Sequence, residues 1–355
     1  MRITDLRTLA CGVGRSTLAA ELGVLGTGEP LVLAPEEWPP EPEAVARAVG
    51  DLPTVVVLLA DPDRVPASAA PLLAAADVCL STRADPPAPW VHADPEALAA
   101  VVAAQPLACH ALVALTRVSQ RLAPAEAIWA ESATYSTLLG SNAYRDWLAA
   151  RPAPRERPEP EHAAEVRHHE GLVRIRLNRP HVRNAIDSRM RDDLVAALEL
   201  LEVAPEVEAE LSGAGACFSA GGDLSEFGRV DDPATAHAVR ATRHPALALS
   251  RVADRVTARV HGPSVGAGVE LAAFARRVLA APDATFRLPE VAMGLIPGAG
   301  GTCSLVRRLG RHRANWLMLT GATLDAVTAR DWGLVDALDG PPAVAPRVPV
   351  AGARA

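Results

Sequence analysis

The sequence predicts an α/β protein, and three observations carry that prediction. Short apolar runs typical of buried strands alternate with stretches whose apolar residues recur at three- and four-residue spacing. Glycine-rich segments occur at 215–224, 262–269 and 291–302, and the first two directly follow predicted strands. With 355 residues, 49% of them apolar, the chain is long enough for one large domain or two ordinary ones.

Residues 1–150 are predicted to form an α/β region that ends in helices. Three strands are expected in its first half, and helical spacing begins near residue 94. The strands cover 30–34, 54–60 and 76–81, and the helical segments cover 96–104, 108–122, 125–139 and 143–151. The next segment is dense in proline and charge, cannot continue a helix, and is interpreted as a linker over 151–163.

Residues 164–339 are predicted to form a second unit of repeated strand, turn and helix. We expect strands at 172–178, 209–213, 257–262 and 278–281, helices at 188–201, 270–278 and 304–321, and a closing helix and strand within 325–338. The last stretch, 340–355, has no periodicity and is expected to be disordered.

Composition excludes several classes of function. The formal charge of -7 argues against broad nucleic-acid binding, which needs a basic face. No apolar run reaches the length of a membrane span, and the N-terminus has no apolar stretch of signal-peptide type, so we expect a cytoplasmic location. The five scattered cysteines show neither zinc spacing nor a disulfide framework, which fits a reducing compartment without a metal site.

Two glutamates beside the glycine-rich turns are the strongest functional signal. Glu270 follows GPSVGAGV (262–269), and Glu290 precedes VAMGLIPGAGGT (291–302). Paired carboxyls with turns that aim backbone N–H groups into one cavity form an acid/base site with an oxyanion hole, suited to chemistry beside a thioester carbonyl. Each feature alone also has a plain structural explanation: an ordinary loop, or a glutamate favoured at a helix start.

The segment 262–266 supports a rival prediction from another class of enzyme. Gly262-Pro263-Ser264-Val265-Gly266 reads as GxSxG between a strand and a helix, which is the nucleophile elbow of α/β-hydrolases with Ser264 as nucleophile. His312 is the only downstream histidine and lies in an arginine-flanked segment that looks exposed. This interpretation also leaves the other two glycine segments without a role.

Three weaker signals have plain explanations. CGVGRST (11–17) resembles a phosphate loop but lacks the lysine of a Walker A motif. His168, His169, His237 and His244 are interpreted as surface histidines. The Trp and Met residues of ANWLML are interpreted as core packing.

Four segments in order resemble the crotonase, or enoyl-CoA hydratase/isomerase, superfamily. They are LNRPHVRNAI, GACFSAGGDL, GPSVGAGVELA and LPEVAMGLIPGAGGT, and the resemblance covers about 165–338. It implies a spiral of ββα repeats, trimers or pairs of trimers, an acyl-CoA substrate, and no cofactor beyond the coenzyme A carried by that substrate.

The resemblance also implies roles for individual residues. Glu270 and Glu290 would be catalytic, and the backbone N–H groups of Gly222 and Ala267 would bind the thioester oxygen. The coenzyme A part of the substrate would contact a larger set: Arg179, His181, Arg183, Phe218, Ser219, Ala220, Asp223, Leu224 and Gly298.

The chain departs from the family pattern at several positions. His181 stands where the family often has Lys, Ser225 lies where a basic residue is common, Leu288 replaces a usual Gln, and Arg276 replaces an Asp. Loss of the Gln removes a hydrogen-bond partner and can raise the pKa of a neighbouring carboxyl.

The family normally continues past WGLVD with a helical tail, and this chain does not. Residues 94–154 resemble that missing tail. We therefore hypothesise that the N-terminal region is a degenerate crotonase-like unit whose helices pack near 304–338.

The expected activity is hydration of a 2-enoyl-CoA. Double-bond isomerisation, thioester hydrolysis and oxygenation on the same fold stay open, since they need only one base. A weakly catalytic acyl-CoA-binding protein is the alternative from another class. The acyl chain and the pathway are not given by the sequence.

Overall fold

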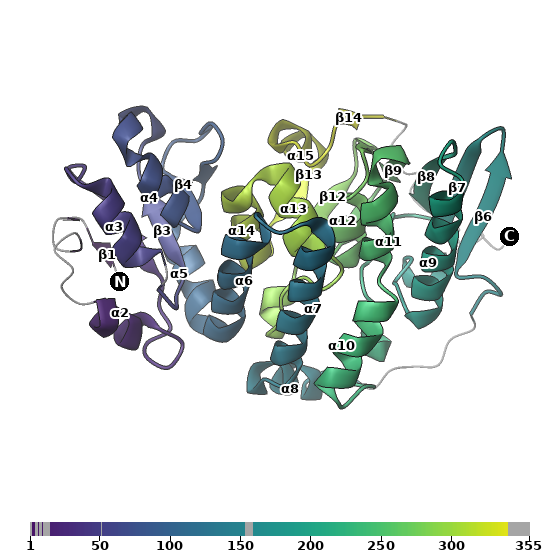
Figure 1. Cartoon of the computed structure of the whole chain (residues 1–355), viewed down its shortest axis with the longest axis horizontal. Helices are drawn as coiled ribbons and strands as arrows, with labels where there is room; N and C mark the ends of the chain where they lie inside the picture. The colour runs from purple at the N-terminus through teal and green to yellow at the C-terminus, as the bar shows by residue number, and fades with distance from the viewer. Residues whose placement is uncertain are drawn as a thin grey trace, which may run out of the picture.

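The computed structural model describes residues 2–3, 6, 9, 15–50, 52–152 and 159–339, which form a mixed α/β structure. Figure 1 shows one sheet at the N-terminal end of the molecule, a second sheet at the opposite end, and helices from both halves of the chain between them. The predicted tail over 340–355 and residues 153–158 of the predicted linker lie outside the described residues, as does most of the 11–17 segment.

The N-terminal part is a five-stranded parallel sheet in the order β1-β2-β3-β4-β5. Its strands are β1 Arg2–Ile3, β2 Leu31–Leu33, β3 Val56–Leu59, β4 Val78–Ser81 and β5 Val91–His92. The connecting helices are α2 Arg15–Leu22, α3 Pro42–Val49 and α4 Ala70–Ala75, with 3-10 turns η1 Pro62–Arg64 and η2 Ala67–Ala69. Strands β2 to β4 are almost wholly buried, as a parallel sheet covered on both faces requires. The three predicted N-terminal strands are confirmed.

Four helices then leave this sheet and run along the second half of the chain. They are α5 Pro95–Ala104, α6 Pro106–Ser119, α7 Pro124–Leu139 and α8 Asn142–Ala149, at the predicted positions. Proline in the first turn of α5, α6 and α7 starts each of these helices where no backbone donor is needed. Helix α6 packs against α13 and α14, and α7 packs against α10, α11 and α13. The contact that our tail hypothesis requires is therefore present; descent from a crotonase-like unit stays a prediction.

A buried polar cluster joins the N-terminal sheet to these helices. Asp77, at the start of β4, is fully buried and accepts from Arg117 of α6 and Arg311 of α14. Asn315 of α14 donates to the Asp77 carbonyl and accepts from Thr116. Because a buried charge is tolerated only when it is paired and hydrogen-bonded, this cluster fixes the position of β4 against α6 and α14.

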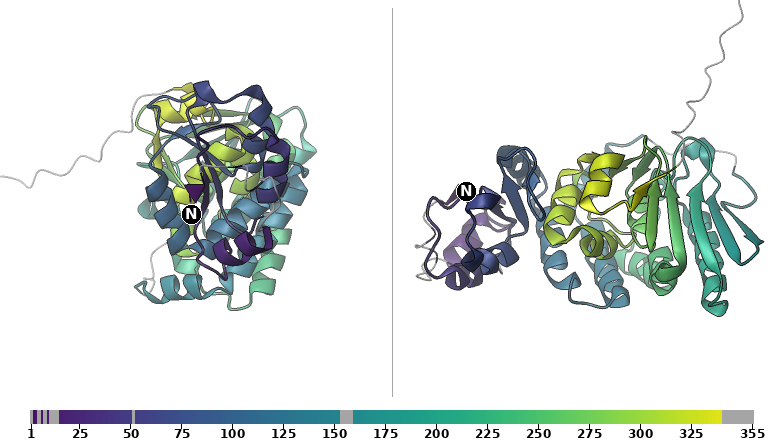
Figure 2. Two further views of the ribbon diagram at one scale, coloured as in Figure 1. Left: turned by 90° about the vertical axis from the view of Figure 1, so that its left-hand side faces the viewer. Right: turned by 90° about the horizontal axis from the view of Figure 1, so that it is seen from above.

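The second half is built on a six-stranded sheet in the order β14-β11-β9-β8-β7-β6. Only β6 and β7 pair antiparallel, and the other neighbours are parallel. The strands are β6 Ala164–His169, β7 Leu172–Leu177, β8 Glu208–Gly213, β9 Val256–Val260, β11 Arg277–Ala280 and β14 Ala337–Leu338. Seen from above in Figure 2, this sheet lies at the opposite end of the molecule from the N-terminal lobe.

A small sheet and a set of helices complete the second half. The sheet has the order β10-β12-β13, with β10 Pro263–Val265, β12 Thr285–Arg287 and β13 Thr323–Asp325. The helices are α9 Ser188–Val203, α10 Pro233–Thr242, α11 Pro245–Val252, α12 Ala267–Ala272, α13 Gly301–Leu309, α14 Arg311–Thr320 and α15 Ala326–Trp332. The 3-10 turns are η3 Pro180–Val182, η4 Leu224–Glu226, η5 Ala253–Arg255 and η6 Glu290–Met293.

Several boundaries in the second half differ from the sequence predictions. The helix expected over 270–278 ends early, at Ala272, whereas its start at Ala267, with Glu270 in the first turn, is where the sequence predicts a helix start. The helix expected over 304–321 is two helices, because Gly310 adopts a φ of +73° between them. Helices α10 and α11 were not predicted; both begin at a proline after a polar cap, Asp232 and His244 respectively.

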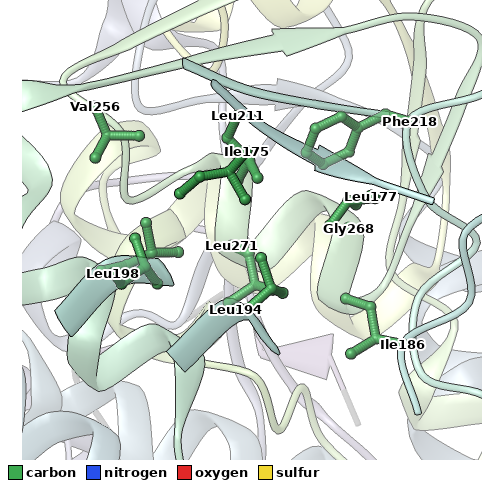
Figure 3. A pocket seen from close by; sticks show the side chains of 11 residues that line it. Ile175, Leu177, Ile186, Leu194, Leu198, Leu211, Phe218, Val256, Gly268 and Leu271 are labelled. Carbon is green, nitrogen blue, oxygen red and sulfur yellow. The ribbon is translucent and has the colours of Figure 1, made fainter. Parts of the chain in front are cut away.

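An apolar space lies between the sheet and helices α9 and α12, as Figure 3 shows. Its wall includes Ile175, Leu177, Leu194, Phe218 and Leu271, and its volume is about 10 Å³. A space of that size barely holds one water and has no polar wall. It belongs to the packed core and is not a binding site.

The described residues contain no single helix that could span a membrane and no cluster of metal-ligating side chains. No single described helix is long and apolar enough to cross a membrane; α5 and α6 together have the length and composition, but they are bent by 108°. No group of His, Cys, Asp or Glu side chains in the described ranges has the arrangement of a metal site. Cys79, Cys109, Cys217 and Cys303 are buried and unpaired.

Candidate active site

Two backbone turns bring Gly222 and Ala267 to one place. Gly221 has a φ of +85°, and a Cβ on it would lie 2.6 Å from the Val265 carbonyl, so only glycine permits this approach. Ala267 is the first residue of α12, after Gly266 with a φ of +49°. Neither the Gly222 nor the Ala267 amide donates to another residue that the structure describes. Both N–H groups are therefore open to an external acceptor.

Glu270 is buried in the first turn of α12 and is held by the loop after η6. Its Oε2 accepts from the amides of Ala299 at 2.7 Å and Gly301 at 2.9 Å. Burial raises the pKa of Glu270 well above its usual value, and the carboxyls of Glu290 and Glu131 raise it further, while the two amides oppose the shift.

Glu290 approaches the same turn from the other side. A Cβ on Gly266 would lie 2.4 Å from Oε1 of Glu290, so the carboxyl rests directly on the backbone that precedes Ala267. Its Oε2 is buried and has no hydrogen-bond partner among the described residues. Burial raises the pKa of Glu290 to about 7, and the charge of Glu131 adds to the shift. Leu288, which replaces the family's Gln, is fully buried and offers Glu290 no polar group.

A third carboxyl, Glu131, comes from α7 in the N-terminal half. It is fully buried and accepts from the Gly300 amide at 2.6 Å, the Thr302 amide at 2.8 Å and the Thr302 hydroxyl at 2.7 Å. Burial raises the pKa of Glu131 to about 7 against these three donors. Sequence analysis missed this residue, although its place on an apolar stretch of a helix was a usable signal.

The segment 298–302, which we name the glycine loop, is thus bound from both sides. Ala299 and Gly301 donate to Glu270, whereas Gly300 and Thr302 donate to Glu131. Alternate amides therefore hold the loop between a carboxyl of α12 and a carboxyl of α7. This arrangement fixes the position of Glu270 and depends on both halves of the chain.

A cavity of about 250 Å³ lies in front of these groups. Its wall carries Gly222, Ala267, Glu270, Glu290 and Gly298. The remaining wall residues come from α7, the start of α9, η4 and the α10–α11 region, with Leu271 and Ala299: Tyr135, Ile186, Asp187, Ser188, Arg191, Glu226, Phe227, Arg240, Arg243, His244 and Pro245. A site with two carboxyls and two open amides on one wall is what the sequence predicted.

A polar groove of about 830 Å³ adjoins this cavity. The two share Gly222, Asp187, Ser188 and Glu226, so the open amide of Gly222 lies where groove and cavity meet. Of the residues predicted to contact coenzyme A, Ala220, Asp223 and Leu224 line this groove, and Gly298 lines the cavity instead.

Arg179 lines the groove but is already paired. Its guanidinium is buried and meets the carboxyls of Glu159 at 2.6 Å, Asp223 at 2.9 Å and Asp187 at 3.3 Å. A cation with three carboxylate partners has little left for a phosphate. The structure therefore argues against direct phosphate binding by Arg179, which fixes the 179–187 turn to Asp223.

Four other predicted coenzyme A contacts lie away from the groove lining. Phe218 is buried and lines the apolar space of Figure 3. Ser219 is buried and its hydroxyl donates to the Asn184 carbonyl. His181 and Arg183 are exposed, with His181 3.7 Å from Glu159. A strand-to-turn motif alternates its side chains, so a whole motif does not face one groove.

The serine-hydrolase alternative is not supported. Ser264 lies in β10, is fully buried, and its hydroxyl has no partner among the described residues. The ring of His312 contacts the Leu73 carbonyl at 2.7 Å, beside the N-terminal sheet. His312 was expected to be exposed, but it is half-buried. A nucleophile needs a base within hydrogen-bond reach, and Ser264 has none there.

Two further side chains in the cavity were misjudged or missed. His244 is only 5% exposed, so its interpretation as a surface histidine was wrong; burial, with the charge of Arg240, lowers its pKa to about 4. Tyr135 of α7 packs on Gly298, where a Cβ would lie 2.5 Å from its ring. His237 is half-buried and bonded to Ser132, whereas His168 and His169 are exposed as predicted.

Comparisons with known proteins identify a family for the second half of the chain. Residues 167–345 match the family model described as enoyl-CoA hydratase/isomerase. An enoyl-CoA isomerase/hydratase of Mycosarcoma maydis is 34% identical over 50% of this chain and 68% of that protein. The 2,3-dehydroadipyl-CoA hydratase of Escherichia coli is 35% identical over 46% of this chain and 64% of that protein.

Solved structures give similar matches over the same half of the chain. A Thermobifida fusca enoyl-CoA hydratase structure in complex with acetoacetyl-CoA shares 32% identity, with 50% of this chain and 73% of that one covered and a TM-score of 0.46. Overall the chain spans about two thirds of the length of the curated relatives that it matches. On the matched residues, this protein belongs to the enoyl-CoA hydratase/isomerase family.

Proposed function

We propose that this protein adds water across the 2,3 double bond of a 2-enoyl-CoA thioester. One observation carries the proposal: Glu270 and Glu290 line the same cavity as the open amides of Gly222 and Ala267. Hydration needs an acid, a base and a stabilised enolate, and this wall offers all three.

The thioester oxygen would accept hydrogen bonds from the Gly222 and Ala267 amides. As water adds at the β-carbon, negative charge moves onto this oxygen, and fixed N–H dipoles stabilise it without reorganising. Removal of one such donor typically lowers kcat by about 10²- to 10³-fold. The helix that begins at Ala267 adds its positive end to the same point.

The two glutamates would share one proton. The pKa values of both are raised, by burial first, so the pair retains a proton near neutral pH. Two amide donors on Oε2 favour the anion on Glu270, which would bind and deprotonate the water. Glu290 lacks such donors on Oε2 and would deliver the proton to the α-carbon.

The groove beside Gly222 would hold the coenzyme A part of the substrate. Arg151, Arg189 and Arg229 lie on its wall and are the nearest cations for phosphate groups once Arg179 is set aside. The trimer, the cytoplasmic location and the absence of a further cofactor stay predictions.

The test is hydration of crotonyl-CoA, followed by the loss of enoyl absorbance. Glu290→Gln and Glu270→Gln should each lower kcat by about 10²- to 10⁴-fold, because each removes one proton-transfer group and keeps the shape. Arg251→Gln, on the exposed face of α11, is the matched control. Conversion of a 3-enoyl-CoA without hydration would identify an isomerase, and coenzyme A binding without any turnover would identify an acyl-CoA-binding protein.

A further inference from the structure

The cavity wall also carries a half-buried cation that has no carboxylate partner among the described residues. Arg240 of α10 lines the cavity, and its guanidinium stacks on the ring of Tyr135 at 4.6 Å from the ring centre. Among the described residues, no carboxylate lies within ion-pair distance of Arg240. Burial lowers the pKa of Arg240, and the nearby Tyr135, Glu131 and Tyr144 oppose this shift.

The hydrogen bonds of Arg240 leave much of its donor capacity unused. Its Nε donates to the Ser132 hydroxyl at 3.2 Å, and its Nη2 donates to the Ser136 hydroxyl. A guanidinium has five N–H donors, so three find no acceptor among the residues that the structure describes. Both acceptors are neutral, and Glu131 acts on Arg240 only through space.

Neighbouring charges on the same wall do not neutralise Arg240. Arg191 and Arg243 share the single carboxyl of Asp192, at 2.9 and 3.4 Å. The acids Asp187 and Glu226 are committed elsewhere, since Asp187 caps α9 and pairs with Arg179 while Glu226 accepts from Ser188. Of the arginines on the cavity wall, Arg240 is therefore the one without a carboxylate within ion-pair distance among the described residues.

The position of Arg240 separates it from the coenzyme A groove. The groove and the cavity share Gly222, and Arg240 lines the cavity but is not part of the groove wall. Tyr135 lies between Arg240 and Gly298 of the glycine loop. A substrate whose thioester oxygen meets Gly222 would place its acyl chain, and not its phosphates, toward α10.

We propose that the acyl group of the substrate carries a carboxylate distal to the thioester, and that Arg240 binds this carboxylate. The proposal rests on the hydratase function proposed above and names its substrate class. A guanidinium donates two parallel N–H bonds to a carboxylate, so the unused donors of Arg240 have the geometry for this group. Arg191 and Arg243 line the same cavity and add positive potential there.

The first test compares matched substrates of equal chain length. Hex-2-enedioyl-CoA ends in a carboxylate and hex-2-enoyl-CoA ends in a methyl group, and pairs of four to eight carbons extend the series. We expect kcat/KM for the better carboxylated substrate to exceed that of its methyl partner by about 10- to 100-fold, the range of a charge-assisted hydrogen-bonded pair. Equal values, or a preference for the methyl partner at every length, would overturn the proposal.

The second test assigns the preference to Arg240. Arg240→Met keeps the length of the side chain and should abolish the preference by lowering kcat/KM for the carboxylated substrate alone. Arg240→Lys keeps the charge and should retain part of it. Arg251→Met, which removes an exposed arginine paired with Glu202 outside the cavity, should leave the ratio unchanged. An equal loss for both substrates in Arg240→Met would show a purely structural role and would contradict us.

A binding measurement separates this proposal from the proposed activity. Adipyl-CoA and hexanoyl-CoA lack the double bond, so their dissociation constants report acyl recognition without turnover. If neither crotonyl-CoA nor hex-2-enedioyl-CoA is hydrated but adipyl-CoA binds at least tenfold more tightly than hexanoyl-CoA, the hydratase proposal fails and the recognition by Arg240 stands. Similar affinities for the two analogues, or no binding of either, would refute the recognition.

Discussion

Glu270 lies in the region that matches the family model, whereas Glu131 lies in the N-terminal helices outside it. Both carboxyls are buried and both accept from amides of the glycine loop, yet only Glu270 lines the cavity. Carboxyls from both regions therefore hold the glycine loop by hydrogen bonds. Of the two, only Glu270 borders the cavity, where it could act on a bound substrate. The boundary of the family match is therefore not a boundary of the candidate active site.

The same contrast holds for the two sheets. The six-stranded sheet and the small sheet carry the turns of Gly222, Ala267 and Glu290. The N-terminal sheet contributes no residue to the cavity or the groove, and it contacts the second half through the Asp77 cluster. The helices α7 and α8 are the part of the N-terminal half that reaches the site, through Glu131 and Tyr135 and through contact with η6.

The largest effect is expected from replacing Glu131 by leucine. The change leaves the amides of Gly300 and Thr302 and the Thr302 hydroxyl without an acceptor in a buried site, so it should lower the free energy of unfolding by about 2–4 kcal/mol. It should also lower kcat more than it raises KM, because the amides of the glycine loop hold Glu270, the proposed base, in position.

Denaturant unfolding and crotonyl-CoA kinetics measure both consequences. Glu131→Gln keeps one carbonyl acceptor, so its free energy of unfolding and its kcat should lie between those of Glu131→Leu and the wild type. Glu126→Gln, exposed on the same helix, serves as the control. Wild-type stability and kcat in Glu131→Leu would show that the N-terminal half does not support the site.

A smaller effect on stability and kcat is expected from adding a Cβ at Gly298, which contacts Tyr135. The φ of Gly298 is not in the left-handed region, so alanine is allowed by the backbone, but its Cβ would lie 2.5 Å from the Tyr135 ring. Overpacking of this kind costs about 1–3 kcal/mol. Gly298→Ala should therefore reduce stability and kcat, and Tyr135→Val should restore part of both.

The double-mutant cycle gives the coupling between the two regions directly. A coupling of at least about 0.5 kcal/mol is expected for residues in contact. Gly140→Ala adds a Cβ whose nearest neighbour is 3.4 Å away and controls for the loss of a glycine. If the effects of Gly298→Ala and Tyr135→Val on the free energy of unfolding simply add, the Tyr135 ring moves aside without an energetic cost.

The glycine-rich turns made much of the site predictable from sequence. Each turn fixes where a strand ends and where a helix begins, and both predicted glutamates line the cavity together with Gly222 and Ala267. The side chains between the turns were less predictable, because Phe218 and Ser219 alternate into the core while Ala220 faces the groove. Local sequence does not show which carboxylates surround Arg179.

Contributions from distant segments could not be predicted. Glu131 and Arg240 occur in helices with ordinary polar spacing, and their roles arise only when α7, α10 and the glycine loop meet. His244 was judged exposed for the same reason, since its burial depends on helix packing that the sequence around it does not encode. The fold class and the N-terminal strands were predicted because periodicity is a local property.

Glu131 and Glu290 should make the stability of the protein change with pH in the same direction. Both have a pKa near 7 in the native protein, above the ordinary 4.5, so the folded state binds more protons than the unfolded state between these values. Their contribution to stability is fully present below about pH 4.5 and is lost as the pH rises through about 7. His244 acts in the opposite direction between pH 4 and 6.5, because its native pKa is lowered.

Comparison with variants isolates the glutamates from the histidines. Glu290→Gln and Glu131→Gln should each gain melting temperature relative to the wild type as the pH is raised from 5 to 8. Thermal unfolding at both pH values measures this difference. If the difference in melting temperature between variant and wild type stays constant with pH, the two carboxyls have ordinary pKa values in the native protein. Burial then does not raise the pKa of a glutamate in either region.

The smallest effect is expected for Ser264→Ala, within the family region but behind the site. The Ser264 hydroxyl is fully buried without a partner, so its removal should leave the free energy of unfolding unchanged or raise it by up to about 1 kcal/mol. Ser219→Ala is the matched contrast, because Ser219 donates to Asn184 and accepts from Gly221 beside the oxyanion turn, and its loss should cost about 1–3 kcal/mol. Crotonyl-CoA turnover should be retained in Ser264→Ala. Loss of turnover in this variant would support Ser264 as the nucleophile. The two serines are buried in adjacent strand segments that bridge each other, so the difference between them depends on hydrogen bonding rather than on burial or position.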